Sequence, residues 1–330
     1  MLRLGIAGFR HNHIYSLINA AQKSERAECV GFWEEYPEDI KTAEENYGIK
    51  LTYKTYEEML SDPGIDAIGI GNYYGARGQM AIKALAAGKH VIADKPLCTS
   101  LEELEEIKRL SKEKGLKVGL MLDLRHNKNV LAAKKLIDEG KIGEVHNVQF
   151  GGQHPLMYGT RPSWYFEEGK HGGVINDIAI HGIDLVSYFT GCKISEILSA
   201  RTWNAYAKDE PSFKDCGQFM LSLSNGAGVI ADVSYSVPDT IGFGIPYYWD
   251  FKIWGSCGML SFSASTDGVK LYKNGEKDVL EVLPIEIEDN YLEAFIDEVL
   301  GMKSSLLSMD EVFDSSEATL LIQKKADSAI

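Results

Sequence analysis

The chain is poor in cysteine and has no long apolar run. Its 330 residues include 5 cysteines, an odd number without a C-x-x-C pair, which favours reduced thiols over a disulfide framework or a cysteine-rich metal site. No apolar stretch approaches the ~20 residues that a membrane span needs. A strand-like pattern begins at Leu2, without the layout of a signal peptide. We therefore expect a cytoplasmic protein with no membrane partner.

Basic side chains are also in deficit. The chain has 34 Lys and Arg against 48 Asp and Glu, a net charge of −14. A field of that sign repels phosphate backbones and anionic lipid, which argues against nucleic-acid and membrane-surface partners. The 45% apolar content is enough for packed cores and excludes a disordered chain. At ~150 residues per domain, the length predicts about two domains.

The first 123 residues alternate between strand-like and helix-like segments. Short apolar runs predict strands over residues 2–7, 29–33, 65–71, 90–93 and 118–122. Helical spacing and helix-end signals predict helices between them, starting near Ile14, Pro37, Thr55 with Glu58, Arg77, and Thr99 with Glu102. Strict alternation is typical of a doubly wound α/β domain, a parallel sheet with helices on both faces.

After residue 123 the pattern changes. It predicts helices over residues 129–138 and 177–189, a strand over 145–150 and an aromatic-rich loop over 151–173. Six β-rich runs follow, over residues 194–202, 218–223, 229–236, 249–254, 259–263 and 269–272, with a type I′ hairpin predicted at Asn225-Gly226. Two helices end the chain, the second opened by Ser308 and Glu311. We expect an α+β domain over residues 124–330, built on a mostly antiparallel sheet.

The turn after the first strand is where a parallel α/β protein holds the pyrophosphate of a dinucleotide. The usual fingerprint is G-x-G-x-x-G, and this chain reads Gly8-Phe-Arg-His-Asn-His13. Arg10 and His13 stand in place of two glycines, and their bulk obstructs close backbone approach, although Arg10 can pair with a phosphate directly. Glu34, after the second strand, is the acidic candidate for the ribose hydroxyls. The alternative is an ordinary βαβ turn with a surface glutamate.

Two further positions carry candidate chemistry. Lys95 stands where an apolar strand ends, and Pro96 biases it toward extended backbone; the alternative is a solvated lysine. Asp177 and His181 are four residues apart, hence on one helical face, with Asp184 about one turn further. A histidine above a carboxylate suits proton transfer near neutral pH. The alternative is an N-cap aspartate followed by a core histidine.

These residues lie in motifs that resemble the glucose–fructose oxidoreductase/inositol dehydrogenase family of nicotinamide-dependent enzymes. Residues 84–97 match the family's A-L-x-A-G-K-H-V-…-[ED]-K-P, and residues 172–184 match its G-G-x-x-x-D-x-x-x-H-x-x-D. The opening strand with Gly8 and residues 136–145 and 254–260 also look like the family. The resemblance implies a Rossmann domain over residues 1–123. It also implies that the open sheet of the following substrate-binding domain mediates contacts between copies.

The resemblance assigns roles to single residues. Lys95, Asp177 and His181 match the family's catalytic residues, with Lys95 close to nicotinamide and substrate and His181 in proton transfer. The implied cofactor contacts are Gly8, Phe9, Arg10, His13, Glu34, Asn72, Tyr73, Asp94 and Lys95. Glu34 falls at the ribose-binding position and favours NAD over NADP, because a carboxylate repels a 2′-phosphate. Asn72-Tyr73 and Arg77 depart from the family's Thr-Pro and its later histidine.

The leading hypothesis is an NAD(P)-dependent dehydrogenase that oxidises a secondary hydroxyl of a sugar, polyol or cyclitol. His181 takes the hydroxyl proton, Lys95 donates to the substrate oxygen, and Asp177 orients the substrate or the histidine. The predicted loop supplies candidate substrate contacts, because aromatic faces suit the C–H faces of sugars and Arg and His suit hydroxyls or a carboxylate. These candidates are His154, Arg161, Trp164 and Tyr165.

Other readings stay open. The missing glycines favour a non-catalytic sensor or scaffold with the same fold, and an NAD-dependent glycosidase is a further possibility within the fold. No recognised ligand spacing joins the eight histidines to cysteines or carboxylates, so the sequence predicts no metal. We expect a homodimer or homotetramer.

Overall fold

A five-stranded parallel sheet in the order β2-β1-β3-β4-β5 forms from the first part of the chain. The computed structural model describes residues 1–287, 290–303 and 306–328. The strands are β1 (Leu2–Ala7), β2 (Ala27–Trp33), β3 (Ala67–Ile70), β4 (His90–Ala93) and β5 (Val118–Leu120), which confirms the predicted parallel sheet. The strand order reverses between β1 and β3, so the carboxyl ends of these strands form the crevice where such sheets bind ligands.

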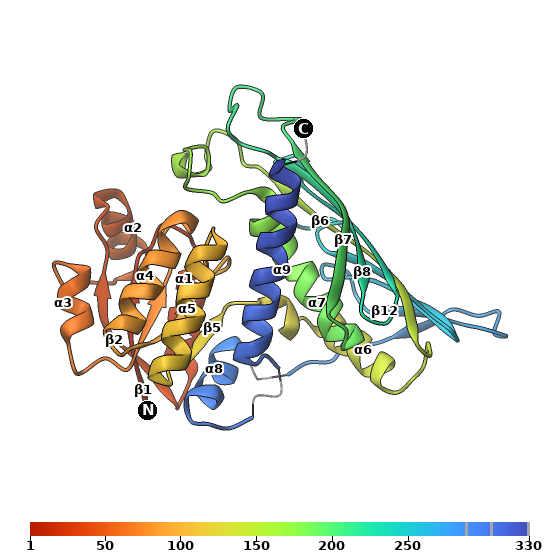
Figure 1. Cartoon of the computed structure of the whole chain (residues 1–330), viewed down its shortest axis with the longest axis horizontal. Helices are drawn as coiled ribbons and strands as arrows, with labels where there is room; N and C mark the ends of the chain where they lie inside the picture. Colours follow the sequence, from red (N-terminus) through yellow and green to blue (C-terminus); the bar gives the residue numbers. More distant parts are fainter. Residues whose placement is uncertain (288–289, 304–305, 329–330) are drawn as a thin grey trace. The chain divides into compact units, whose positions relative to one another are not determined.

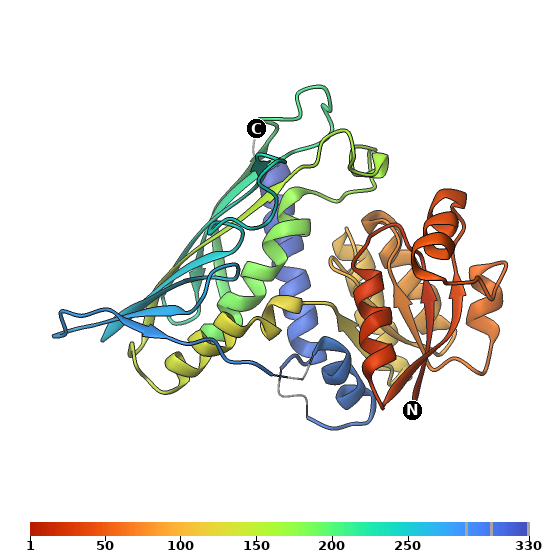
Figure 2. The same ribbon diagram turned by 180° about the vertical axis from the view of Figure 1, so that it is seen from behind.

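Helices cover both faces of this sheet (Figures 1 and 2). The helices are α1 (Ile14–Lys23), α2 (Pro37–Tyr47), α3 (Tyr56–Ser61), α4 (Tyr74–Ala86), α5 (Leu101–Lys114) and α8 (Tyr291–Val299). One face packs against α1 and α8, whose Leu17 and Phe295 join Leu4 and Ile6 of β1 in a single buried cluster. The other face packs against α4 and α5. Burial on both faces explains why these strands are almost continuously apolar.

The chain divides into two compact units. Unit 1 comprises Met1–Leu122, Gly169–Gly172 and Asp289–Glu317; unit 2 comprises Asp123–Glu168, Gly173–Glu288 and Ala318–Ile330. A segment near the end of the sequence, Asp289–Glu317, therefore returns to unit 1. A Cβ on Gly119 of β5 would lie 2.7 Å from the Phe295 ring, so this glycine lets α8 approach the sheet closely.

Most helix ends of unit 1 follow the expected signals. Pro37 starts α2, Gly48 ends it with a φ of +66°, and the Thr55 hydroxyl accepts from the Glu58 backbone N–H at 3.1 Å. The capping box expected at Thr99 is wrong by one residue, because Ser100 accepts from the Glu103 N–H at 3.2 Å and the helix starts at Leu101. Helix α4 starts three residues before Arg77, at Tyr74.

Unit 2 is built on an eight-stranded sheet in the order β13-β12-β11-β10-β6-β9-β8-β7. Its strands are β6 (Val145–Pro155), β7 (Ile194–Trp203), β8 (Cys216–Leu223), β9 (Gly228–Val237), β10 (Asp250–Gly255), β11 (Gly258–Ser263), β12 (Val269–Lys273) and β13 (Leu280–Val282). Every neighbouring pair is antiparallel except β6 and β9. The mostly antiparallel sheet is therefore as predicted.

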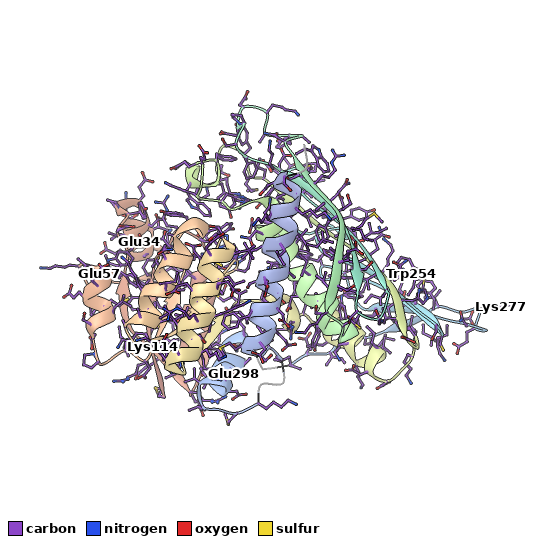
Figure 3. The ribbon with its side chains drawn as sticks, in the orientation of Figure 1. Glu34, Glu57, Lys114, Trp254, Lys277 and Glu298 are labelled. Atoms are coloured by element: carbon purple, nitrogen blue, oxygen red, sulfur yellow. The ribbon has the colours of Figure 1, made fainter. Side chains whose placement is uncertain are left out.

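The two faces of this sheet differ in polarity and cover. Helices α6 (Lys128–Asp138) and α7 (Ile180–Thr190) lie over one face (Figure 1), where the Phe150 ring stacks on Phe251 at a centroid distance of 5.7 Å. On the opposite face Met220 and Ile230 are paired across β8 and β9 and are 45% and 49% exposed. Trp254, labelled in Figure 3, alternates along β10 with the buried Ile253.

Several local expectations for unit 2 are corrected. Strand β6 continues to Pro155, five residues beyond its predicted end, because it pairs with β9 along its length. The predicted helix at Asp177 is preceded by a π-helical turn, Ile175–Ala179, so Asp177 lies inside the helical segment and is not an N-cap. The hairpin at Asn225-Gly226 forms, but only Gly226 has a positive φ, +84°. The Asn225 side chain instead accepts from the Ala227 N–H, so the turn is not type I′.

The last helix, α9 (Met309–Ser328), begins as expected. The Ser308 hydroxyl accepts from the Glu311 N–H at 3.3 Å, and the Glu311 carboxylate accepts from the Ser308 N–H at 2.8 Å. This confirms the capping box. Within the part of the chain that the structure describes, every helix is too short or too polar to cross a bilayer.

Candidate active site

The turn after β1 requires the one glycine that the fingerprint retains. Gly8 has a φ of +85°, and a Cβ there would lie 2.7 Å from the Asn72 backbone nitrogen. Its N–H donates to the Trp33 carbonyl at 2.9 Å. Gly8 therefore lets the ends of β1, β2 and β3 approach one another at the crevice.

Glu34 closes this turn from the end of β2, where Figure 3 labels it. Its side chain is 3% exposed and accepts from the N–H groups of Phe9 at 2.5 Å, Glu35 at 2.7 Å and Tyr36 at 2.9 Å. Burial raises the pKa of Glu34, and the three N–H donors oppose that shift. A carboxylate offers about four acceptor positions, so one remains for a hydroxyl group such as that of a ribose.

The two residues after Gly8 are Phe9, at a variable position of the fingerprint, and Arg10, at its second glycine position. The Phe9 ring is buried and packs on Tyr15 at 5.8 Å, so its backbone N–H rather than its side chain faces Glu34. The Arg10 guanidinium lies 3.9 Å from the Tyr36 ring centre and 3.5 Å from the Asp39 carboxylate. Arg10 is thus held beside the start of α2, and a contact with phosphate remains a prediction.

A buried arginine organises the ends of β3 and β4. Arg77 donates to the backbone carbonyls of Asn72 at 2.7 Å, Asp94 at 2.9 Å, Lys95 at 2.5 Å and Pro96 at 3.3 Å. It also donates to the Asp94 carboxylate at 2.8 Å. Burial alone would raise the pKa of Asp94, but Arg77 and two neighbouring histidines hold it well below its usual value. Asp94 is therefore a buried carboxylate anion.

Those histidines belong to the turn after β1. His11 Nδ1 lies 2.5 Å from Asp94 Oδ2, and His13 Nδ1 lies 3.2 Å from Asp94 Oδ1. The Tyr74 hydroxyl is 3.2 Å from His11 Nε2, and Lys95 Nζ lies 5.9 Å from the Tyr74 ring centre. Burial lowers the pKa of His11 to about 4, so its imidazole is uncharged at neutral pH. Asp94 thus connects the turn to the strand end that carries Lys95.

The other two cofactor candidates follow β3. Asn72 is 2% exposed, and its side-chain oxygen accepts from the Tyr73 N–H at 2.8 Å. The Tyr73 ring packs near Tyr36, at 6.5 Å, and the Lys170 ammonium lies 5.2 Å from its centre. Asn72 therefore shapes the turn into α4. Tyr73 lies on the side of the crevice next to Tyr36, near the end of β2.

Unit 2 carries the second group of candidates. Asp177 and His181 are 3% and 5% exposed and lie on consecutive turns. The Tyr235 hydroxyl donates to the Asp177 carboxylate. His181 Nδ1 lies 3.6 Å from Asp123 Oδ1, and its ring packs edge-on against Trp249 at 5.5 Å. Asp177 thus has a hydrogen-bond donor in Tyr235, and the Asp123 carboxylate lies near His181 Nδ1, just beyond hydrogen-bond distance.

The predicted substrate residues divide into two kinds. The His154 ring packs against Trp249 at 5.5 Å, as His181 does, and Arg161 lies over the rings of Tyr165 at 4.7 Å and Tyr235 at 5.9 Å. These contacts bring His154, Arg161 and Tyr165 to the residues around Asp177 and His181. Trp164 is fully buried and packs on Tyr165 at 4.2 Å, so in this structure it supports the loop. Arg161 also donates to the Leu156 carbonyl at 2.8 Å, which fixes the loop's backbone.

Asp184, the last residue of the motif over residues 172–184, has a structural partner. Its carboxylate accepts two hydrogen bonds from Arg125, at 2.8 and 2.7 Å, and both side chains are 1% exposed. A bidentate, buried pair of this kind fixes α7 to the segment before α6. The motif thus combines candidate chemistry at Asp177 and His181 with a packing role at Asp184.

Sequence reasoning missed two tyrosines. Tyr74 contacts His11, Arg77 and Lys95, and Tyr235 donates to Asp177. Neither stands in a recognised motif, and the Tyr235 partner is 58 positions away in the sequence. The only signal was the position of Tyr74 directly after the strand-end residues Asn72 and Tyr73.

The residues of unit 1 fit a dinucleotide. Gly8 keeps the tight turn, Glu34 keeps an acceptor position for a ribose hydroxyl, and Lys95 stands at the carboxyl rim of β4. Arg10 and His13 replace the glycines that would let backbone N–H groups face the pyrophosphate. Contacts to the phosphates must then come from side chains.

Comparison with known proteins agrees with this geometry. Residues 2–121 match the model of an oxidoreductase family with an NAD-binding Rossmann fold, and residues 130–261 match the GFO/IDH/MocA C-terminal domain. A crystal structure from Erwinia carotovora atroseptica is similar over 99% of both chains, with 26% identity and a TM-score of 0.90.

Two curated relatives are named dehydrogenases. The scyllo-inositol 2-dehydrogenase (NAD(+)) of Bacillus subtilis is 27% identical over 256 residues, covering 73% of this chain and 68% of that protein. The levoglucosan dehydrogenase of Pseudarthrobacter phenanthrenivorans is 30% identical over 174 residues, covering 51% and 44%. The chain spans about half the length of several curated relatives that it matches. By its two matched domains, the chain belongs to the GFO/IDH/MocA oxidoreductase family, whose N-terminal Rossmann fold binds NAD.

Proposed function

We propose that this protein is an NAD-dependent dehydrogenase that oxidises a secondary hydroxyl of a sugar, polyol or cyclitol. Residues 1–123 bind the cofactor and residues 124–330 bind the substrate. The observation that carries the proposal is the pair Asp177 and His181, both nearly buried, with Tyr235 donating to the first and Asp123 facing the second. A buried carboxylate and an oriented imidazole on consecutive turns are the groups that proton transfer from an alcohol requires.

His181 is the proton acceptor in this proposal. Its Nδ1 faces Asp123, so we assign Nε2 to the hydroxyl proton of the substrate. Asp123 favours the cationic ring that forms when His181 accepts the proton. Asp177, held by Tyr235, orients the substrate hydroxyl or His181 itself.

Lys95 donates to the substrate oxygen and stabilises negative charge there during oxidation. The carbonyl of Lys95 accepts from Arg77 at 2.5 Å, so its backbone is held in place before any ligand binds. NAD, when bound, supplies the hydride acceptor. Glu34 holds a ribose hydroxyl and disfavours NADP, as the carboxylate would repel a 2′-phosphate.

The substrate class is supported by the side chains around Asp177. The Tyr165 and Tyr235 rings offer apolar faces to C–H groups, while Arg161 and His154 offer hydrogen bonds to hydroxyls. Both curated relatives described above act, by name, on a cyclitol or an anhydrosugar.

The test is a screen of purified protein against sugars, inositols and their acids, with NAD and with NADP, followed by NADH absorbance. The Lys95→Ala variant should lose activity by at least about a hundredfold. Lys114→Ala is the matched control, since Lys114 is an exposed lysine at the end of α5 in the same unit (Figure 3). Equal turnover by Lys95→Ala and Lys114→Ala would refute the assignment.

One observation favours the alternative hypothesis of a sensor or scaffold: Arg10 and His13 stand at two glycine positions of the fingerprint. Calorimetric titration with NAD and NADH separates it from the dehydrogenase. Micromolar binding supports the enzyme, and absence of binding by both nucleotides supports the scaffold.

We propose further that the open face of the eight-stranded sheet joins copies of the chain. Met220 and Ile230 pair across β8 and β9 on that face, and Leu198 of β7 is 48% exposed. Neighbouring exposed apolar residues on a sheet are typical of an interface.

The five cysteines are free thiols, which supports a cytoplasmic location.

A further inference from the structure

Three side chains from distant parts of unit 1 converge on one point. One ring nitrogen of His11, one of His13 and a carboxylate oxygen of Asp94 all lie within 4.8 Å of one another. The two Nδ1 atoms lie 2.5 and 3.2 Å from the carboxylate. The histidines are in the turn after β1 and the aspartate follows β4, 83 and 81 positions away. Two imidazole nitrogens and one carboxylate oxygen are a donor set that zinc and related divalent ions bind, with further positions open to exogenous ligands.

Two of the three ligand groups, His11 and Asp94, have the outer partner that metal sites require. Tyr74 Oη lies 3.2 Å from His11 Nε2, the ring nitrogen opposite the cluster. Arg77 donates to Asp94 Oδ2 at 2.8 Å and leaves Oδ1 toward His13. Such partners fix the orientation of ligating histidines and carboxylates.

The hydrogen bonds seen here show how a cation would enter. A proton on each Nδ1 now bridges the imidazole to the Asp94 carboxylate. When a divalent cation takes both Nδ1 positions, each neutral imidazole keeps its one proton on Nε2, and that of His11 then donates to Tyr74 Oη. The 2.5 Å contact between His11 Nδ1 and Asp94 Oδ2 lengthens to admit the cation, while Arg77 keeps its hydrogen bond to Oδ2 and Oδ1 faces His13.

The local charge indicates what completes the coordination. Arg77 already neutralises the Asp94 carboxylate, and Lys95 is the next residue. A divalent cation at this point adds positive charge to a site without net negative charge, so an anion must accompany it. This is the turn at which a Rossmann domain holds pyrophosphate, and here two of its glycines are missing.

We propose that His11, His13 and Asp94 bind a divalent transition cation of the zinc class, whose remaining positions take oxygens of the dinucleotide pyrophosphate. The proposal rests on the NAD binding described under the proposed function. In this proposal, the cation binds the pyrophosphate oxygens in place of the backbone N–H groups of a glycine-rich turn. This site was not predicted from the sequence, because the carboxylate that completes it follows another strand, β4.

The test begins with protein freed of metal by chelation and dialysis. Calorimetric titration with zinc chloride, and visible d–d absorption on titration with cobalt chloride, should show one bound ion per chain. With NAD present the ion should bind about tenfold more tightly, and with the ion present NAD should gain the same factor. A coupling of this size with NAD but not with nicotinamide alone identifies the pyrophosphate as the coupled group.

Variants test the two histidine ligands. His13→Ala and His11→Gln should each weaken ion binding by at least tenfold, since loss of an outer partner alone costs ~10–100-fold. His146→Ala is the matched control, a histidine exposed on β6 of unit 2. Circular dichroism and urea unfolding establish that each variant is folded. Ion binding that is unchanged in both turn variants, or absent from the parent protein, overturns the site.

The two proposals fail separately. NAD binding in chelator without any zinc binding overturns the metal site and leaves the dehydrogenase standing. Zinc binding without NAD binding overturns the pyrophosphate role and the proposed function together, while the metal site itself stands. Zinc binding and NAD binding without coupling overturns the pyrophosphate role alone.

Discussion

Arg77 and Asp94 form a salt bridge in which neither side chain has any exposed surface, with Nη2 2.8 Å from Oδ2. The same guanidinium donates to four backbone carbonyls. One side chain therefore both neutralises the Asp94 carboxylate and fixes the backbone at the end of β4, next to Lys95. Removing one partner of such a pair is costly, because the other charge stays buried.

We expect Arg77→Ala to lower the free energy of unfolding by about 3–5 kcal/mol. Arg77→Lys should recover only part of the loss, because an ammonium group cannot reproduce the planar fork. Urea unfolding of both variants and of the Lys114→Ala control measures this. A loss below about 1 kcal/mol in Arg77→Ala would contradict the role of the pair.

The second prediction concerns cofactor choice and pH. Burial raises the pKa of Glu34, so on acidification it becomes neutral at a higher pH than an exposed glutamate does. A neutral carboxyl does not repel a 2′-phosphate, and the preference for NAD over NADP should fall as the pH falls. Glu34→Gln should lower that preference by about tenfold or more, since a like-charge contact at 4 Å is worth ~1–4 kcal/mol.

Dissociation constants for both nucleotides at several pH values test this. The 2′-phosphate also titrates, near pH ~6, and the Glu34→Gln variant isolates that contribution. An identical pH dependence of selectivity in the parent and in Glu34→Gln would show that Glu34 is not the discriminating group.

The third prediction concerns Tyr235. Tyr235→Phe removes the hydroxyl that donates to Asp177 and keeps the ring. A hydrogen bond to a charged group is worth ~1.5–3 kcal/mol, so kcat/KM should fall about 10–100-fold. Tyr247→Phe is the control, because that side chain is 64% exposed. A shift in the pH profile of kcat should accompany the fall if Tyr235 acts through Asp177, and a fall without any shift would indicate a packing role only.

The fourth prediction concerns assembly. The double variant Met220→Lys/Ile230→Lys places two charges on the open face of the sheet, where both residues are about half exposed. Light scattering should show a smaller assembly than for the parent protein. The control is Lys277→Glu, which changes a charge at the tip of the hairpin between β12 and β13 (Figure 3). An unchanged mass in the double variant places the interface elsewhere.

Local signals in the sequence predicted elements well, because their physical causes are local. Pro37 and Gly48 mark the two ends of α2 through fixed and left-handed backbone angles. The same kind of reasoning misplaced the cap at Thr99, since Ser100 has an equally suitable hydroxyl and an equally placed glutamate three residues on. Choosing between them depends on how α5 packs, which no local pattern contains.

Relationships across the fold were not predictable in the same way. Lys95, Asp177 and His181 were found because they stand in motifs, yet the groups that orient them come from elsewhere. Tyr235 reaches Asp177 from β9, 58 residues later in the sequence, and Arg77 reaches Asp94 from a helix before β4. Hydrogen bonds of this kind join residues whose separation is set by sheet register and helix docking, and these follow from the whole tertiary structure.

The return of Asp289–Glu317 to unit 1 has a consequence for biosynthesis. On the ribosome β1 to β5 emerge first, but the face that α8 covers stays open until Leu292 and Phe295 have been made. At ~5–20 residues per second that interval is about 8–35 s. Throughout it, the sheet around Gly119 lacks the Phe295 ring that packs on it in the finished fold. The unit that begins the chain is thus completed by a segment synthesised near its end.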